Sequence, residues 1–397
     1  MEFSSKAMDV TPSSTLAITA KAKEMKANGI DVIGFVAGEP DFDTPKHIKQ
    51  AAIDAIDEGF TKYTPASGIV ELRQAIADKM KKDNNVEYDY TQIIVSNGGK
   101  HALTNAFTAI LNPKDEVIIP SPFWLSYPQM VKLADGVPVI VTTKKENGFK
   151  ITKEEFENAI TPKTKAIIIN NPNNPTGMVY TKSELEDIAE VAVKNDIFVI
   201  ADDMYEKLIY DNEKHICIAS LNDEIYKRTI VVNGLSKSYA MTGWRIGYTA
   251  APKEISAIMS NVQSHSASNI NSIAQKAAYA AFTSSQDCIE EMRLEFEKRK
   301  NYMVEKIRNI DKISMLEPKG AFYVFIDISE LLGKTIDGIE IKGAREFGQI
   351  LLNKANVAII PCTDFGFDDH IRLSYAISLE NIKEGLDRIE KFIKENY

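Results

Sequence analysis

The stretch that decides the fold is GLSKSYAMTGWRIG, residues 234–247. It follows a β-branched run at residues 229–232, which is typical of a buried strand, and it places Lys237 and Arg245 among small side chains. A lysine at the end of a strand can form a Schiff base with an aldehyde cofactor. An arginine close behind it can bind the phosphate of that cofactor through its planar guanidinium. The stretch therefore predicts a pyridoxal phosphate site, although most lysines in proteins are only surface residues.

Composition excludes several classes of protein. The chain has 397 residues, of which 44% are hydrophobic and 26% charged, as in ordinary globular proteins with two or three domains. The net charge of -9 argues against nucleic acid as a partner. No apolar run approaches the roughly 18 residues needed to span a membrane, and the first residues lack a signal-peptide pattern. The three cysteines and five histidines have no metal-site spacing. We therefore expect a cytoplasmic protein without metal.

Strand-like and helical segments alternate through the middle of the chain. The expected strands lie at 93–95, 116–119, 137–141, 166–169, 197–200 and 229–232, and helices at 45–58, 69–82, 100–111 and 182–195. This alternation indicates βαβ units, so we expect an α/β domain with a mostly parallel sheet covered by helices on both faces.

The pattern changes near residue 290. A charged helix at 290–310 is followed by strands at 321–326, 357–360 and 371–375 and by a final helix at 379–394. We therefore predict a large cofactor-binding domain at 45–290 and a smaller α+β domain at 291–397. Residues 1–44, with one helix and a short strand, are expected to pack with the small domain.

Polar side chains follow several of the apolar strands. Asp202 follows one of them and can pair with a protonated pyridine nitrogen, and the Tyr205 phenol can then reach the oxygen on the ring. Asn174 lies in the loop NNPNNPTG after another strand and can donate to the same oxygen. Asp202 could instead be a helix cap, and the asparagine loop could be a structural turn.

Two further motifs point to the same ligand. Gly98, Gly99 and Lys100 lie between a strand and a helix, where backbone N–H groups attract phosphate. Trp124 follows the next strand and can stack on an aromatic cofactor. Considered by themselves, the two glycines could mark only a turn, and the tryptophan could be only a core residue. Their order along the chain favours a single cofactor site.

With these motifs together, the sequence resembles the class I aminotransferases of pyridoxal-phosphate fold type I, and among them the subgroup Ib aspartate aminotransferases. The resemblance runs almost end to end and rests on AGEPDF at 37–42, YTPASG at 63–68, NPTG at 174–177, the lysine stretch, and RLSY at 372–375. It implies a large domain with a seven-stranded type of sheet, a smaller α+β domain, and pyridoxal 5'-phosphate as cofactor.

The resemblance also implies a role for each site residue. Lys237 would be the Schiff-base lysine and proton carrier, and Arg372 would bind the substrate α-carboxylate beneath the segment that contains Gly38. Tyr63 would reach the cofactor of a second subunit, which implies a homodimer with shared sites. The remaining cofactor contacts would come from Gly98, Gly99, Lys100, Trp124, Asn174, Asp202, Tyr205 and Arg245.

One position differs from a common pattern of the family. Many relatives carry Ser-x-Ser-Lys, whereas this chain has Gly234 in place of the first serine. One hydroxyl contact to the phosphate is then missing, and we expect the other donors to compensate.

The expected reaction is a ping-pong transfer of an amino group from one amino acid to a 2-oxo acid. Subgroup Ib relatives share Ser13, Thr15 and Lys100, and these groups suit a dicarboxylate, so aspartate and 2-oxoglutarate are the expected pair. Ser13 and Thr15 could equally be helix-capping residues. Alternatives are prephenate or broad aromatic specificity, a β-lyase or aminocyclopropane-carboxylate synthase on the same fold, and, least of all, a regulator without activity.

Overall fold

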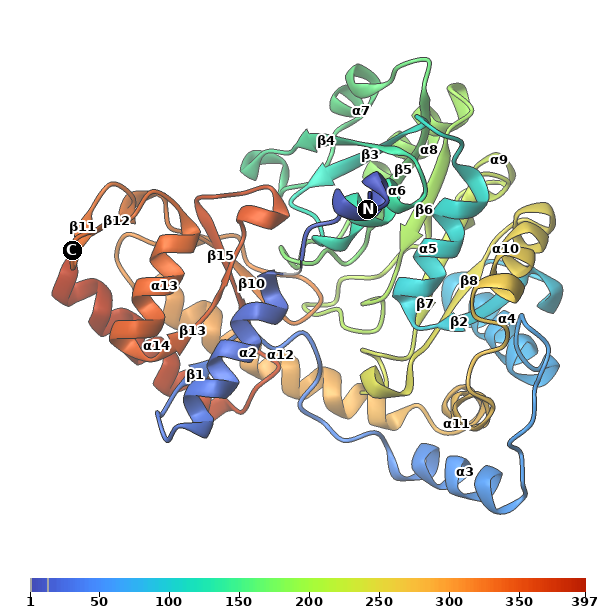
Figure 1. Cartoon of the computed structure of the whole chain (residues 1–397), viewed down its shortest axis with the longest axis horizontal. Helices are drawn as coiled ribbons and strands as arrows, with labels where there is room; N and C mark the ends of the chain where they lie inside the picture. The colour runs from blue at the N-terminus through green and yellow to red at the C-terminus, as the bar shows by residue number, and fades with distance from the viewer. Residues whose placement is uncertain (1, 13) are drawn as a thin grey trace.

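The computed structural model describes residues 2–12 and 14–397. The chain forms a larger body, which contains the green and yellow segments, and a smaller orange and red body (Figure 1). The long helix α12 (Asp287–Arg308) runs from the edge of the larger body into the smaller one. No helix in the described part of the chain is long and apolar enough to cross a membrane.

A seven-stranded sheet forms the centre of the larger body. Its order is β2 (Ile93–Asn97), β8 (Ile246–Ala250), β7 (Thr229–Gly234), β6 (Phe198–Asp202), β5 (Thr164–Asn170), β3 (Glu116–Ser121) and β4 (Val137–Thr142). Strand β8 is antiparallel to both of its neighbours, and every other pair is parallel. The predicted α/β class and mostly parallel sheet are confirmed. Strand β8 was not predicted, because it overlaps the end of the lysine stretch and contains Gly247.

Helices cover both faces of this sheet, as the apolar strands require. In β5, Ile168 packs into one cluster and its neighbours Ile167 and Ile169 pack into the opposite one, the alternation of a strand. The covering helices are α5 (Gly99–Ile110), α6 (Ser126–Leu133) and α10 (Lys253–Ser266) on one face, and α7 (Lys153–Ala159), α8 (Lys182–Lys194) and α9 (Asp223–Tyr226) on the other. A further cluster joins α3 (Lys46–Asp57), α4 (Val70–Asn84) and α11 (Ser272–Thr283).

The smaller body is an antiparallel sheet packed against helices. The sheet has the order β14 (Ile360–Pro361), β15 (His370–Ser374), β10 (Tyr323–Asp327) and β9 (Ser314–Met315). Its apolar cluster includes residues of α12, α13 (Ala344–Ala355) and α14 (Leu379–Asn396). A short hairpin of β11 (Thr335–Ile336) and β12 (Ile339–Glu340) lies at its edge. The predicted second, α+β part of the fold is therefore present.

The N-terminal segment contacts both bodies. Ion pairs join Lys6 to Asp135 and Asp9 to Lys132, which place the short helix α1 (Ser5–Met8) against α6 of the larger body. Helix α2 (Ser14–Ala27) then lies beside the smaller body (Figure 1). Strand β1 (Ile33–Gly34) pairs in parallel with β13 (Val357–Ala358) of that body. The N-terminal segment therefore packs with the smaller body through β1 and with the larger body through α1, and the domain boundaries near residues 44 and 290 stay a prediction.

The topology brings polar loop residues to one edge of the large sheet. Strands β5, β6 and β7 are parallel and adjacent, so their carboxyl ends meet. Asn170 at the end of β5 lies opposite Asp202 at the end of β6. The loop after β5 carries Asn174 and the loop after β7 carries Lys237. Segments that are distant in the sequence therefore converge on a single site.

Candidate active site

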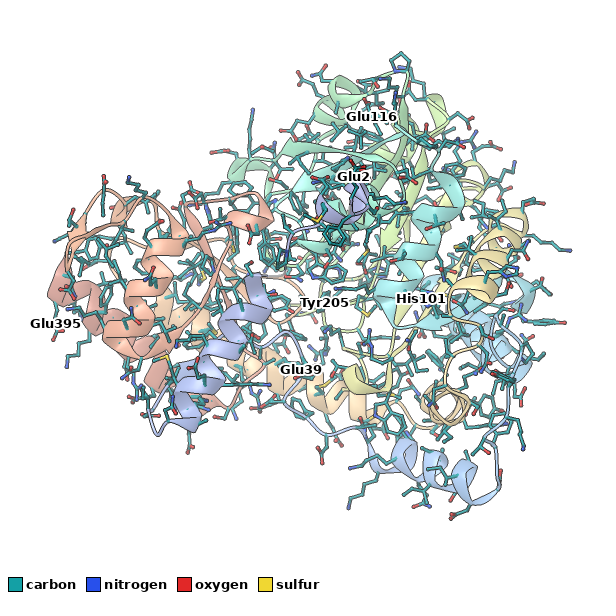
Figure 2. The ribbon with its side chains drawn as sticks, viewed as in Figure 1. Glu2, Glu39, His101, Glu116, Tyr205 and Glu395 are labelled. Carbon is teal, nitrogen blue, oxygen red and sulfur yellow. The ribbon has the colours of Figure 1, made fainter. Side chains whose placement is uncertain are left out.

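A cavity of about 700 Å³ lies between the two bodies. Tyr205 and Glu39, which line it, lie in the middle of the molecule, where the bodies meet (Figure 2). The predicted site residues that line this cavity are Thr15, Gly38, Gly99, Lys100, Trp124, Asn174, Asp202, Tyr205, Lys237, Arg245 and Arg372. Gly98 precedes the lining residue Gly99 in the chain, Tyr63 does not line the cavity of its own chain, and Ser13 falls outside the described residues.

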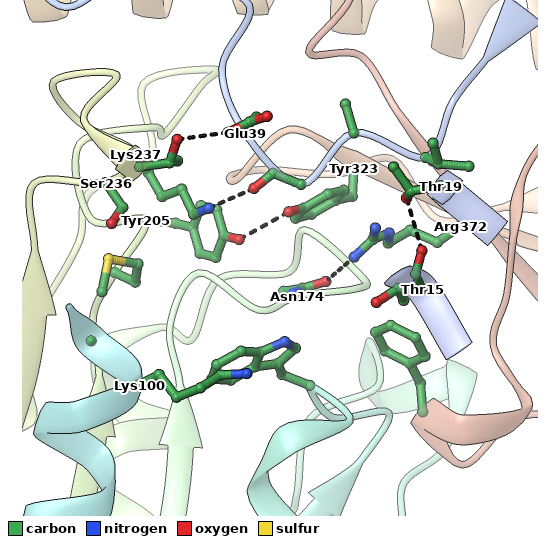
Figure 3. Close-up of a pocket in the computed structure, with 18 of the residues that line it drawn as sticks. Thr15, Thr19, Glu39, Lys100, Asn174, Tyr205, Ser236, Lys237, Tyr323 and Arg372 are labelled. Atoms are coloured by element: carbon green, nitrogen blue, oxygen red, sulfur yellow. Dashed lines mark hydrogen bonds between the residues drawn. The ribbon is translucent and has the colours of Figure 1, made fainter. Parts of the chain in front are cut away.

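Lys237 reaches across the cavity to the N-terminal segment. Its Nζ donates a hydrogen bond of 2.5 Å to the backbone carbonyl of Gly38 (Figure 3). Burial lowers the pKa of the Lys237 amine to about 8, against the opposing effect of the Glu39 carboxylate, and the cationic Arg372 and Arg245 lower it further. A lysine of this kind is partly neutral near physiological pH, as a proton carrier must be.

Asp202 is buried at the end of β6 and is held from two sides. One carboxylate oxygen accepts a 2.5 Å hydrogen bond from the Tyr127 phenol, and the other accepts from the backbone N–H of Met204 at 3.3 Å. Burial raises the pKa of the Asp202 carboxyl to about 6, despite these hydrogen bonds. A carboxylate whose charge is disfavoured by burial is well suited to a cationic partner.

Tyr127 was not predicted from the sequence. It follows Trp124 by three residues at the start of α6, so both side chains fall on the same face of that turn. Their rings contact edge to face, with centroids 5.4 Å apart. A phenol one turn after a candidate stacking aromatic is a signal that could have identified it.

Tyr205 pairs with a second tyrosine that was not predicted. The two phenol oxygens of Tyr205 and Tyr323 lie 3.0 Å apart, and either can donate. Burial raises the pKa of both phenols, so both keep their protons at neutral pH. Tyr323 comes from β10 of the smaller body, 118 residues away in sequence, so no local motif reveals the pair.

Arg372 lies on β15 and points into the cavity toward Asn174 (Figure 3). Its Nη1 donates to the Asn174 side-chain oxygen at 3.0 Å, and its guanidinium lies over the ring of Tyr323 at 4.2 Å and that of Phe365 at 5.5 Å. Its Nε is buried and has no hydrogen-bond partner among the described residues. A buried guanidinium with an unused donor suits a carboxylate ligand.

Close backbone contacts shape the end of the cavity near α5. Gly98 has a φ of 86°, and a Cβ there would overlap the Arg245 guanidinium. The Arg245 Nη1 donates to the Thr242 carbonyl at 2.8 Å. The first N–H groups of α5 lack partners within the helix and so attract an anion, as Arg245 does. These donors fit a phosphate group.

Glycine stands at position 234, where many relatives have serine, and the structure gives a steric reason for it. A Cβ at Gly234 would lie 2.8 Å from the Ile246 carbonyl oxygen and 3.2 Å from the Met204 methyl group. Strand β8 and Met204 together fill the space that a serine side chain would need. At this end of the cavity, the backbone at Gly99 and the Arg245 side chain are groups that could donate to a phosphate.

The charges around the cavity are mostly positive, in a chain with a net charge of -9. The basic side chains that line it are Lys23, Lys26, Lys100, Lys237, Arg245 and Arg372, and the acidic ones are Glu39 and Asp202. A cavity with this excess of cations attracts anionic ligands. The described residues hold no cluster of three or more metal-ligating side chains.

Comparison with known proteins identifies the family. The family model for aminotransferases of class I and II matches residues 30–389. The chain belongs to the class I and II aminotransferases. Enzymes of this family use pyridoxal phosphate, so the predicted cofactor and the predicted aminotransferase activity are confirmed. Their substrates are amino acids and 2-oxo acids.

Individual relatives match the chain over almost its whole length. An aspartate aminotransferase of Bacillus sp. (strain YM-2) is 52% identical and aligns over 97% of both chains. A probable aspartate/prephenate aminotransferase of Aquifex aeolicus is 47% identical over 99% of both. The solved aspartate aminotransferase of Rhizobium meliloti superposes with a TM-score of 0.96, at 40% identity and 99% coverage of both chains. These matches also confirm the predicted fold type.

Proposed function

We propose that this chain is an aspartate aminotransferase that transfers the amino group to 2-oxoglutarate in two half-reactions. The observation that carries the proposal is the convergence of Lys237, Asp202, Arg245 and Arg372 on one cavity. Relatives named aspartate aminotransferase at 47% to 52% identity support the choice of donor. The cytoplasmic location stays a prediction.

Lys237 is the proposed general base and acid. Its neutral amine would remove the proton from the substrate α-carbon and deliver it to the cofactor carbon that carries the substrate nitrogen. Bound pyridoxal phosphate supplies the electron-withdrawing ring that accepts the electron pair left at that carbon. Asp202, which accepts the hydrogen bond from Tyr127, would keep the ring nitrogen protonated, and the Tyr205 and Asn174 side chains would hold the ring oxygen. Trp124 would stack against the ring, and Arg245, Gly98 and Gly99 would hold the phosphate.

Arg372 is the proposed partner of the α-carboxylate common to all amino acids, with Gly38 on the segment above it. The second carboxylate of aspartate is proposed to bind at Lys100 and Thr15, which lie on the cavity wall. Thr15 is placed by helix α2, where its carbonyl accepts a 2.8 Å hydrogen bond from the Thr19 hydroxyl. The relative from Thermus thermophilus was solved with maleate, a dicarboxylate, which supports this pair of sites.

Prephenate is a second candidate substrate. Several relatives at 44% to 47% identity are named aspartate/prephenate aminotransferases. Prephenate also carries two carboxylates, so the same cations would serve. Prephenate contains a ring that aspartate lacks, and a cavity of about 700 Å³ would accommodate this bulkier substrate.

We also propose a homodimer with shared sites. The Tyr63 side chain is 91% exposed and does not line the described cavity of its own chain. Tyrosine is among the residues that are enriched at protein–protein interfaces. In a dimer this phenol would reach the phosphate in the cavity of the second subunit.

One set of measurements tests the function. Purified enzyme supplied with pyridoxal phosphate should produce glutamate from 2-oxoglutarate with aspartate as donor, and more slowly with phenylalanine. Prephenate as acceptor tests the second candidate, and sedimentation of the same sample tests the dimer. Ammonia release without glutamate would show a lyase and overturn the proposal. Borohydride treatment should attach the cofactor to Lys237, and a label elsewhere would overturn its role.

A further inference from the structure

Glu39 is a cavity residue without a role in the reaction described so far. It lies next to Gly38, whose carbonyl accepts the hydrogen bond from Lys237, and its own carboxylate accepts a 2.6 Å hydrogen bond from the Thr242 hydroxyl (Figure 3). Thr242 begins the short turn that ends at Trp244, just before Arg245. Two consecutive residues of the N-terminal segment are therefore bound to the loop that carries the lysine.

The same two segments are joined at a further point. The Thr44 hydroxyl donates to the Ala240 carbonyl at 2.8 Å and accepts from the Trp244 indole N–H at 3.0 Å. Asp41 lies between these contacts and forms a 2.7 Å ion pair with Arg299 of α12. Segment 38–44 is thus fastened both to the lysine loop and to the smaller body, which fixes where the Glu39 carboxylate lies.

The charges that face Lys237 come from four elements. Arg372 on β15 and Arg245 before β8 repel an ammonium group at this position, whereas Asp202 on β6 and Glu39 on the N-terminal segment attract it. Asp202 already accepts a hydrogen bond from Tyr127 and is the proposed partner of the cofactor. Glu39 is the remaining carboxylate among the described residues of the cavity wall.

We propose that Glu39 is a positioning residue that stabilises the protonated form of free Lys237 and holds the Gly38 carbonyl against it. The inference rests on the proposed role of Lys237 as proton carrier. In this arrangement Glu39 increases the protonated fraction of the released lysine beneath the segment that covers the substrate. Glu39 therefore sets how readily that lysine acts as a base.

The test measures the ionisation of Lys237 directly, in the full-length protein after removal of the cofactor. Competitive labelling with acetic anhydride over a range of pH, with mass spectrometry of the peptide that contains Lys237, reports the midpoint of its titration. Glu39→Gln keeps an acceptor for Thr242 but removes the charge. We expect the Lys237 midpoint to fall by at least about 0.5 pH units in this variant. In Glu39→Asp, which keeps the charge, the midpoint should lie close to the wild-type value.

Asp43→Asn is the matched control, because Asp43 lies on the same segment and its side chain is 96% exposed, 3.5 Å from Lys49. In this control variant, the titration midpoint of Lys237 should equal that of the wild type. An unchanged or raised midpoint in Glu39→Gln, or an equal shift in the control, would overturn the proposal. The rising limb of the kcat profile of the loaded enzyme should move to lower pH by the same amount.

The outcomes separate this inference from the proposed function. A shifted midpoint in a protein that transfers no amino group supports the electrostatic role of Glu39 and refutes the proposed function. An unshifted midpoint in an active aminotransferase refutes the role of Glu39 and leaves the function standing. Thr242→Val, which breaks only the hydrogen bond, should raise KM with little change in the midpoint, because it loosens the segment but keeps the charge.

Discussion

The two sides of the cavity are built in different ways. On the side of the large sheet, Asp202, Asn174 and Lys237 lie at or after the ends of adjacent parallel strands, and buried hydrogen bonds hold the Asp202 and Asn174 side chains. On the opposite side, Thr15 and Gly38 belong to the N-terminal segment and Arg372 belongs to the small sheet. We call these the cofactor side and the substrate side.

The difference suggests a division of labour. The cofactor side is formed by one rigid sheet and serves chemistry that is the same for every substrate. The substrate side is assembled from parts that are distant in sequence and exposed to the cavity, so changes there can alter specificity without loss of the chemistry. Substitutions on the two sides should therefore differ in how evenly they affect different substrates.

The largest effect is expected for Asp202→Asn on the cofactor side. Loss of the negative charge opposite the ring should lower kcat by about 10²- to 10³-fold, the size of effect seen when a preorganised charge partner is removed. The loss should be equal for aspartate, glutamate and phenylalanine in half-reactions followed by absorbance. A loss confined to the dicarboxylates would place Asp202 on the substrate side instead.

The same variant should be more stable than the wild type when no cofactor is bound. Burial raises the Asp202 pKa from its ordinary value near 3.8 to about 6. The charged form is therefore disfavoured in the folded protein, and the wild type loses stability as pH rises from about 4 through 6. At pH 7 asparagine should raise the free energy of unfolding by on the order of 2–3 kcal/mol. Urea unfolding at pH 7 and at pH 4.5 should show a smaller gain at the lower pH.

Arg372→Lys should give the next largest effect. Lysine keeps the positive charge but loses the planar pair of donors, and it also loses the contact with Asn174. We expect kcat/KM to fall about 10²-fold for every amino acid, mostly through KM, because each of them carries the α-carboxylate. Steady-state kinetics equal to the wild type would refute the assignment.

Sequence alone was most informative about the cofactor side. Lys237, Asp202 and Asn174 each follow an apolar strand, and parallel strands end at one edge of a sheet, so the order of the motifs is enough to bring these residues together. Arg245 lies close to Lys237 in the chain. Local order was therefore sufficient for the parallel strands of the sheet, for the fold class and for the cofactor.

The substrate side was less accessible to sequence reasoning. Tyr323 reaches the cavity only through the packing of the small body, which no local pattern encodes. Glu39 lies in the AGEPDF motif next to Gly38, but the motif alone does not show that its side chain lines the cavity. Arg372 was found through the RLSY motif and the resemblance, not through periodicity. Strand β8 was missed for a related reason, since it is an antiparallel strand inserted between parallel ones and contains Gly247.

The smallest effect, and the sharpest test of the comparison, is expected for Lys100. This residue lies in the first turn of α5 on the cofactor side, yet it is the proposed partner of the second carboxylate of the substrate. Its Nζ lies 5.1 Å from the centre of the Trp124 ring, and burial together with Arg245 lowers its pKa. A cation this open to the cavity should contribute about 1 kcal/mol at most to binding of a second carboxylate.

Lys100→Gln should therefore lower kcat/KM for aspartate about three- to fivefold and leave alanine and phenylalanine unchanged. Lys21→Gln is the matched control, because Lys21 pairs with Glu24 on the surface of α2 and does not line the cavity. An equal loss for alanine would mean that Lys100 acts on the phosphate of the cofactor. The positive end of α5 would then belong wholly to the cofactor side, and dicarboxylate specificity would depend on the N-terminal segment alone.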